Sequence, residues 1–95
     1  MSLTVQIRKE GKVAVLYLAG NLTLHTARLA REAIQEQMKE DTDSFRFELS
    51  GLDRIESAGL GELIRVYSSV RRRSFSARLS VMTYKFRELL QVARL

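Results

Sequence analysis

The sequence predicts an α/β fold, with a mixed four-stranded sheet and helices packed mainly on one of its faces. Four short segments are either alternating or continuously apolar, as expected of strands. Three longer segments, two of them between strands, carry apolar residues at helical spacing. The resulting order β-β-α-β-α-β-α predicts an N-terminal hairpin followed by right-handed parallel crossovers.

The predicted hairpin consists of two strands joined by a tight turn. Residues 3–9 alternate between apolar and polar, whereas residues 13–19 are continuously apolar and rich in β-forming side chains. Gly11 lies between them, where a glycine favours a tight turn. Gly20 is expected to end the second strand.

The remaining elements are predicted from strand-like alternation and from apolar residues at helical spacing. In chain order they are a helix over 26–40 capped by Thr23 or Thr26, a loop at 41–43, a strand at 45–49, a helix from Ser57 to the arginines at 71–73, a strand at 77–82 and a helix at 84–95. Alternation along the strands indicates one packed face and one wet face. The side chains expected on the wet face are Arg46, Glu48, Arg78 and Ser80.

The size and composition of the chain fit a single domain over residues 1–95. Hydrophobic residues make up 45% and charged residues 28%, as in ordinary soluble proteins. No apolar run is long enough to span a membrane and no signal peptide is visible, so a cytoplasmic location is expected. The net charge of +5 favours acidic partners, although it also lies within the range that simply keeps a small domain soluble.

Few residues could support catalysis, and an enzyme is not expected. The chain has no cysteine and one histidine, His25, at the start of the first predicted helix, where a plain helix-end role fits it. A serine triad needs a histidine that a carboxylate orients beside the nucleophile. The G-x-S-x-G elbow and both glycine-rich phosphate motifs are absent. Neither a metal site nor a cofactor is therefore expected.

Ser57 stands where the second predicted helix begins, in the stretch ESAGLG. As the N-cap it would close the helix, which is a common role for serine. The free amides and the dipole of a helix start also attract anions, so a phosphate on this hydroxyl is the alternative. Gly59 and Gly61 would keep the turn bare and let another protein's backbone approach.

Arginines gather at the end of the same helix. Arg71, Arg72 and Arg73 are consecutive, with Arg65 and Arg78 on neighbouring elements. A solvated helix end explains them, because positive charge suits the negative end of the dipole. A site for an anion, a nucleotide or an acidic protein is the alternative. Direct nucleic-acid binding is not expected, because interleaved aromatics and a helix-turn-helix are both lacking.

The segment FELSGLDRIESAGLGELI (residues 47–64) resembles the signature of the STAS domain, which occurs in bacterial anti-sigma factor antagonists and in the cytoplasmic tails of anion transporters. That signature is a strand ending in an acidic-Leu-Ser pattern, a short loop, and a D-S-S-G-L-G or D-[ST]-x-G-L turn that opens a helix. VLYLAGNLTLHTA (15–27) is similar to the family's strand with G-x-L-D and its following helix. VMTYKFRELLQVARL (81–95) is similar to the closing helix, so the likeness covers nearly the whole chain.

The resemblance implies a non-enzymatic protein that takes part in signalling and transcription regulation. The family's small cytoplasmic members bind a serine-kinase anti-sigma factor and release the sigma factor; the kinase phosphorylates a hydroxyl of the D-S-S-G turn and a phosphatase removes it. In this chain the usual acceptor position is Ala58, and Ser57 matches the first serine. Glu56 replaces the aspartate, and Thr23 replaces the acid of G-x-L-D.

These departures leave several partners open. Relatives without the acceptor resemble constitutive binders or scaffolds, and others that keep only the first hydroxyl serve a phospholipid ABC system or stress-signalling complexes. The leading expectation is a kinase or scaffold partner, and the alternative is docking on a transporter ATPase without phosphorylation. The residues expected to meet the partner are Thr23, His25, Glu56, Ser57, Ala58, Gly59, Gly61, Glu62, Arg65, Ser69 and Arg72.

The resemblance also bears on the end of the chain. The family usually continues beyond the position of Leu95 into a short strand and sometimes a helix. The expectation is either a trimmed end or a sheet edge that a partner completes. Because an unpaired edge strand can add another strand, a homodimer is one predicted arrangement.

Overall fold

The computed structural model describes residues 2–73 and 76–80 of the chain. In chain order its elements are β1 (Leu3–Glu10), β2 (Val13–Leu22), α1 (Ala27–Met38), β3 (Ser44–Ile55), α2 (Ser57–Arg72) and β4 (Ser76–Ser80). The strands form one sheet in the order β1-β2-β3-β4. β1 and β2 are antiparallel, whereas β2–β3 and β3–β4 are parallel, so the mixed four-stranded sheet with its opening hairpin is confirmed. The helix predicted at 84–95 lies outside the described residues.

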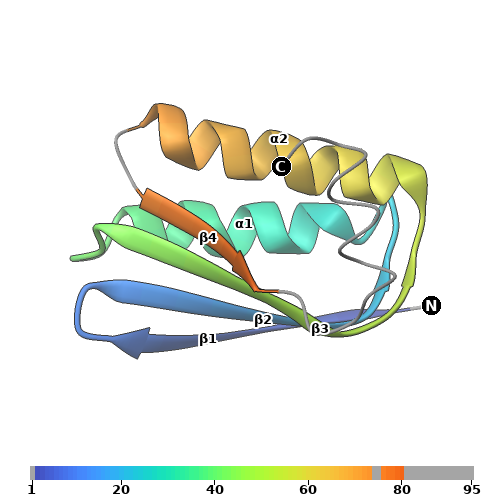
Figure 1. Cartoon of the computed structure of the whole chain (residues 1–95), viewed down its shortest axis with the longest axis horizontal. Coiled ribbons are helices and arrows are strands. Elements are labelled where there is room, and N and C mark those ends of the chain that lie inside the picture. Colours follow the sequence, from blue (N-terminus) through green and yellow to red (C-terminus); the bar gives the residue numbers. More distant parts are fainter. Residues whose placement is uncertain (1, 74–75, 81–95) are drawn as a thin grey trace.

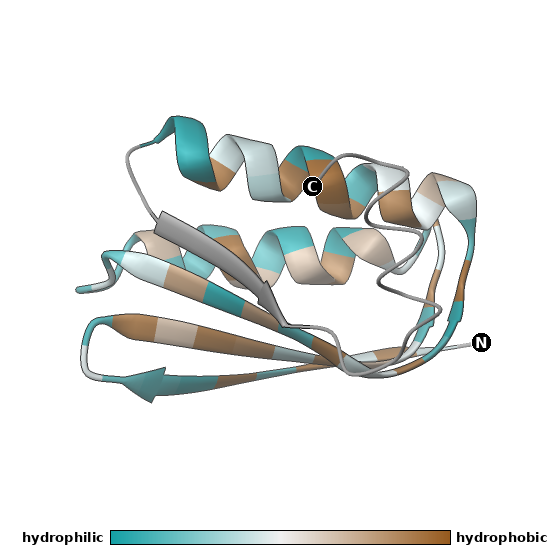
Figure 2. Ribbon diagram, in the orientation of Figure 1, coloured by the Kyte–Doolittle hydropathy of each residue, from teal (hydrophilic) through white to brown (hydrophobic). Residues whose placement is uncertain are grey.

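Both described helices cover the same face of the sheet, where α1 and α2 lie side by side (Figure 1). Hydrophobic residues dominate β2 and alternate with more polar ones along β3 (Figure 2). This alternation turns every second strand residue toward the helices. The core between the layers comprises, among others, Ala14, Leu16, Leu18, Phe45, Phe47 and Leu49 of the sheet, Ala27, Ala30 and Ile34 of α1, and Leu60, Leu63, Val66 and Val70 of α2.

On the face of the sheet opposite the helices, β3 carries polar side chains. Arg46 lies between two carboxylates there, with Nε 3.1 Å from Glu48 and a terminal nitrogen 3.9 Å from Glu10. The predicted placement of Arg46 and Glu48 on this face is therefore confirmed. The side chains of Arg78 and Ser80, predicted for the same face, lie outside the description.

The two central strands extend beyond their predicted ends. Gly20 does not end β2, and β3 continues past residue 49 to Ile55, with register shifts that keep the two strands paired. The φ of Gly20 is +102°, and a Cβ there would lie 2.5 Å from the carbonyl oxygen of Ser2. This glycine therefore accommodates the close approach of the chain start, instead of stopping the strand.

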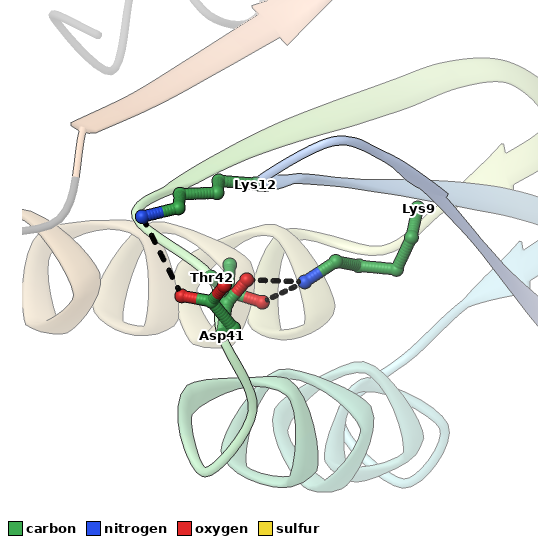
Figure 3. A network of polar contacts seen from close by, with 4 residues as sticks. All are labelled: Lys9, Lys12, Asp41 and Thr42. Atoms are coloured by element: carbon green, nitrogen blue, oxygen red, sulfur yellow. Dashed lines mark hydrogen bonds and ion pairs between the residues drawn. The ribbon is translucent and has the colours of Figure 1, made fainter.

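The end of the sheet away from the helix starts is held by the hairpin and the α1–β3 loop. Lys9 Nζ donates to the carbonyl oxygen of Asp41 (2.8 Å) and to Thr42 Oγ1 (2.6 Å), and Lys12 Nζ lies 3.7 Å from the Asp41 carboxylate (Figure 3). The Asp43 amide donates to the carbonyl oxygen of Lys12 at 2.9 Å. The predicted loop is confirmed. Its contacts lie at one end of the sheet, and the two helix starts lie at the other end.

Candidate partner-binding surface

The starts of α1 and α2 meet at one edge of the sheet. β2 and β3 are parallel neighbours and each leads directly into a helix, so both helices begin at the carboxyl ends of the strands. Residues at this edge are favourably placed for ligands in open α/β sheets. The Glu56 amide donates to the carbonyl oxygen of Leu22 at 2.9 Å, which joins the two helix starts. The Thr23–His25 loop and the Ser57 turn therefore form one region, as the sequence analysis expects.

Ser57 is the first residue of α2, and Glu56 occupies the N-cap. Glu56 has φ −92° and ψ 148°, and its carbonyl oxygen accepts from the Leu60 amide at 2.9 Å. The prediction that Ser57 caps the helix is wrong by one residue, because the chain leaves its extended conformation only after Glu56. Among the described residues, no side chain caps this helix start.

The surface at this helix start is polar and open. Ser57 and Ala58 are exposed. Across residues 2–73 and 76–80, no group bonds to the Ser57 hydroxyl or accepts from the amides of these two residues. These amides belong to the first turn of a helix, which has no internal acceptors for them. The positive end of the helix dipole is thus presented to solvent at Ser57.

Gly59 lies in the interior, whereas the sequence predicted that it keeps the surface of the turn bare for a partner. The residue is buried, and a Cβ added to it would lie 2.6 Å from the carbonyl oxygen of Leu22 and 2.8 Å from the carbonyl carbon of Thr23. Only glycine lets α2 approach the end of β2 this closely. Gly61 differs, because a Cβ there would meet nothing within 4 Å. Of the two glycines, Gly61 alone keeps space open outside the helix.

Thr23 is also internal, with 5% of its surface exposed. Its Oγ1 accepts from the Thr26 amide at 3.1 Å, and the Thr26 Oγ1 accepts from the Thr23 amide at 2.8 Å. This reciprocal pair has the bonding pattern of a capping box over residues 23–26, the turn that leads into α1. Thr26, the N-cap residue of α1, makes no side-chain bond to the amides of the helix itself. Both residues suggested as caps therefore act together. The exposed side chains of this loop are Leu24 and His25.

The polar side of α2 is linked to α1 through Glu62. One carboxylate oxygen of Glu62 accepts from Arg65 at 3.0 Å, and the other lies 3.9 Å from Arg31 of α1. Glu62 has 22% of its side chain exposed, whereas Arg65 has 80% exposed. Glu62 and Arg65, two of the predicted contact residues of α2, therefore lie along the boundary between the two helices.

A groove of about 380 Å³ follows this boundary. Four of the residues that were predicted to meet a partner line it: Glu62, Arg65, Ser69 and Arg72. The sequence analysis missed the α1 side, which contributes Arg31, Gln35 and Met38. Their spacing on α1 is the signal that could have found them, because residues separated by three or four positions share a helix face. The other lining residues are Ile34, Val66, Val70 and Arg73.

The three consecutive arginines do not act as one cluster. Arg71 lies over the Tyr67 ring, 5.9 Å from its centroid, and donates to the Tyr67 hydroxyl at 3.5 Å. Arg72 and Arg73 instead line the groove, and Arg73 lies 3.7 Å from the Met38 sulfur. Arg71 therefore lies apart from the other two arginines, although the three are consecutive in the sequence.

Within the described residues, no three histidine, cysteine or acidic side chains gather as a metal site. None of the helices described is long and apolar enough to cross a membrane.

These features define a small mixed α/β domain that exposes one uncapped helix start at the edge of its sheet. A family model described as "Mlab, STAS domain" matches residues 5–95. The chain therefore belongs to the STAS domain family, and the resemblance noted in the sequence is confirmed. Comparison with curated protein sequences finds no match.

Solved structures share the fold at low sequence identity. An anti-sigma factor antagonist from Mycobacterium paratuberculosis is 18% identical, with a TM-score of 0.80 over 98% of this chain and 79% of that one. The unphosphorylated anti-sigma factor antagonist SpoIIAA is 17% identical, with a TM-score of 0.73 over 93% of this chain and 82% of that one. Mglu is 15% identical, with a TM-score of 0.76 over 83% of this chain but 20% of its own. The same fold therefore makes up most of the first two structures and a smaller part of the third.

Proposed function

We propose that this chain is a non-enzymatic regulatory protein of the anti-sigma factor antagonist type. It docks on a serine-kinase anti-sigma factor, or on a stress-signalling scaffold, through the start of α2 and the outer side of that helix. The observation that carries the proposal is the exposure of Ser57 at the start of α2. Its hydroxyl is exposed and bonds to nothing in the described part of the chain, beside two unpaired helix-start amides. An exposed hydroxyl beside free amides is available to another molecule, either as a phosphate acceptor or as a hydrogen-bonding group.

Phosphorylation of Ser57 fits this position physically. A phosphoserine carries about −1.5 to −2 charges near neutral pH. The dipole and the free amides of the first turn stabilise such a charge, so the fold tolerates it. A partner fitted against the uncharged turn would meet a bulky anion instead. The modification therefore releases the partner without unfolding the domain.

The test uses the anti-sigma kinase encoded nearest to the gene. The purified chain is incubated with this kinase and ATP, and the phosphate is mapped by mass spectrometry. Partner affinity is measured for the original protein, for Ser57→Asp, and for Ser50→Asp, a matched control that places the same charge on another exposed serine. The proposal requires weaker binding for Ser57→Asp alone. Equal affinity of all three proteins would contradict it, and binding without any phosphate on Ser57 would favour the scaffold form.

A second candidate is an accessory subunit of a phospholipid ABC-type transport system, docked on its ATPase. The observation that favours it is Ala58, which removes the hydroxyl from the usual acceptor position of the turn while leaving the surface exposed. In this function Ser57 contacts the ATPase and is never modified. Co-purification with an ATPase, with unmodified Ser57 in the isolated complex, would decide for it, whereas co-purification with a kinase would decide against it.

A further inference from the structure

The groove between α1 and α2 has an excess of positive charge. Four arginines line it, namely Arg31, Arg65, Arg72 and Arg73, whereas Glu62 is the one acid among its lining residues. Three positive charges therefore remain unmatched. Glu62 already contacts Arg31 and Arg65. The described residues offer no acidic partner to Arg72 or Arg73, and the Arg73 guanidinium donates to the Met38 sulfur at 3.7 Å.

The groove also offers an apolar contact. Ile34, Val66 and Val70 are buried, with at most 7% of their surface exposed, so the half-buried Met38, at the end nearest Arg73, is the most accessible apolar side chain of the lining. Methionine is flexible and polarisable, so it adapts to differently shaped apolar groups. A free anion would use the arginines and leave Met38 without an apolar partner. The volume of about 380 Å³ suits a few inserted side chains and is too small for a folded domain.

From this combination we infer that the groove binds a short acidic segment of the partner protein, with an apolar side chain inserted between the helices and carboxylates placed on Arg72 and Arg73. The inference rests on the proposed function only in that a protein partner approaches α2. The groove follows α2 from Glu62 toward its C-terminal end, beyond the Ser57 turn. It therefore supplies partner recognition that does not depend on whether Ser57 is modified.

Arginine is well suited to this task. Its planar guanidinium pairs with a carboxylate through two parallel hydrogen bonds. Charges at the rim of an interface mainly select the partner and speed its association, whereas a buried apolar anchor slows its release. The groove offers both kinds of contact, with exposed arginines for carboxylates and the half-buried Met38 for an apolar side chain.

The probe is a fluorescent 12-residue peptide with leucine at helical spacing and glutamate at the remaining positions, and a second peptide has glutamine for glutamate. Fluorescence anisotropy is measured against the original chain and against Arg65→Glu/Arg72→Glu/Arg73→Glu. The matched control, Arg8→Glu/Lys12→Glu/Arg54→Glu, makes the same change in net charge on exposed side chains outside the groove. Circular dichroism checks that all three proteins are folded.

The acidic peptide is expected to bind the original chain and the control variant, and to lose about tenfold or more in affinity for the groove variant. Raised salt should weaken binding, and the glutamine peptide should bind poorly. Equal losses in both triple variants would overturn the inference in favour of nonspecific attraction to a basic protein. Groove-dependent binding of ATP, or of anionic lipid vesicles, with no binding of the peptide would overturn it in favour of those ligands.

A partner assay separates this inference from the proposed function. If the groove variant binds the identified kinase or ATPase normally while Ser57→Asp does not, the groove inference is wrong and the proposed function stands. If both variants bind normally, both are wrong. Loss of binding by the groove variant supports the inference whatever the effect of Ser57→Asp.

Discussion

The starts of α1 and α2 occupy equivalent places at the ends of two parallel strands, yet they are finished in opposite ways. At the start of α1, Thr23 and Thr26 bond each other's amides, and Thr23 is 5% exposed. At the start of α2, the N-cap Glu56 makes no side-chain bond and Ser57 is exposed. One start is closed by its own residues, while the other leaves its amides and its hydroxyl to solvent.

This difference separates stability from binding. A closed capping box stabilises a helix and offers little to a partner. An open start forgoes that stabilisation and keeps an anion-favouring surface available. The two starts are nevertheless coupled through Gly59, which packs against the Leu22–Thr23 backbone. The comparison therefore predicts that changes at α1 and at Gly59 affect folding, whereas changes at Ser57 affect binding.

The largest effect is expected at the contact between the two starts. Gly59→Ala places a Cβ 2.6 Å from the Leu22 carbonyl oxygen, so α2 must move or the strand end must shift. Overpacking of this kind destabilises a protein by about 1–3 kcal/mol. The loss would be measured as a decrease in the free energy of unfolding in urea. Gly61→Ala is the control, because its Cβ has open space and alanine favours the helix by about 0.8–1.0 kcal/mol. Equal effects of the two substitutions would contradict the packing role of Gly59.

The capping box of α1 should show the next largest effect. Thr23→Ala removes the buried hydroxyl that accepts from the Thr26 amide, and the loss of a capping bond of this kind is expected to lower the free energy of unfolding by about 1–2 kcal/mol. Thr23→Ser keeps the hydroxyl and should restore most of that loss. Because Thr23 and Thr26 bond each other, the double alanine variant should lose less than the sum of the single variants. Additive losses in thermal and urea unfolding would show that the two hydroxyls act separately.

Ser57 should contribute little to stability. Ser57→Ala removes a hydroxyl without an internal partner, so the free energy of unfolding should change by less than about 0.5 kcal/mol. Ser57→Asp adds negative charge at the positive end of the dipole and should stabilise the domain by about 0.3–1 kcal/mol, less at high salt. The same variant should bind the partner weakly. A large loss of stability in either variant would mean that this helix start is structural, like that of α1.

The smallest stability effect is expected at Glu62. Glu62→Gln removes the carboxylate that contacts Arg31 and Arg65, and pairs as exposed as that with Arg65 contribute about 0–1 kcal/mol. The change also frees both arginines, so the acidic peptide should bind more tightly in the anisotropy assay. The control is Glu32→Gln on the exposed side of α1, which should leave peptide binding unchanged. Weaker peptide binding by Glu62→Gln would contradict the proposed charge distribution of the groove.

Several elements could be predicted from the sequence because they depend on the pattern of neighbouring residues. The alternation of residues 3–9 and the apolar run of 13–19 predict the hairpin, and Gly11 has the positive φ of a tight turn. The apolar stripe of α2 is also local in origin. The strand ends were not predictable in this way, because residues 50–55 extend β3 only by pairing with the end of β2.

The candidate site was predictable in its location but not in the roles of its residues. The STAS signature marks the Ser57 turn, and Ser57 is exposed there. Thr23 and Gly59 lie in the same motifs, yet their side-chain positions face the interior. Nothing in their local sequence distinguishes them from surface residues, because their neighbours belong to another segment of the chain.

By itself, the sequence determined the order of the elements, the family and the place of the turn, since hydrophobic period and turn residues act over a few positions. Tertiary structure alone decided which helix start is closed, which glycine faces inward, and which arginines converge beside α1. These properties depend on contacts between segments far apart in the chain. The same local pattern can therefore end in either a sealed or an open surface.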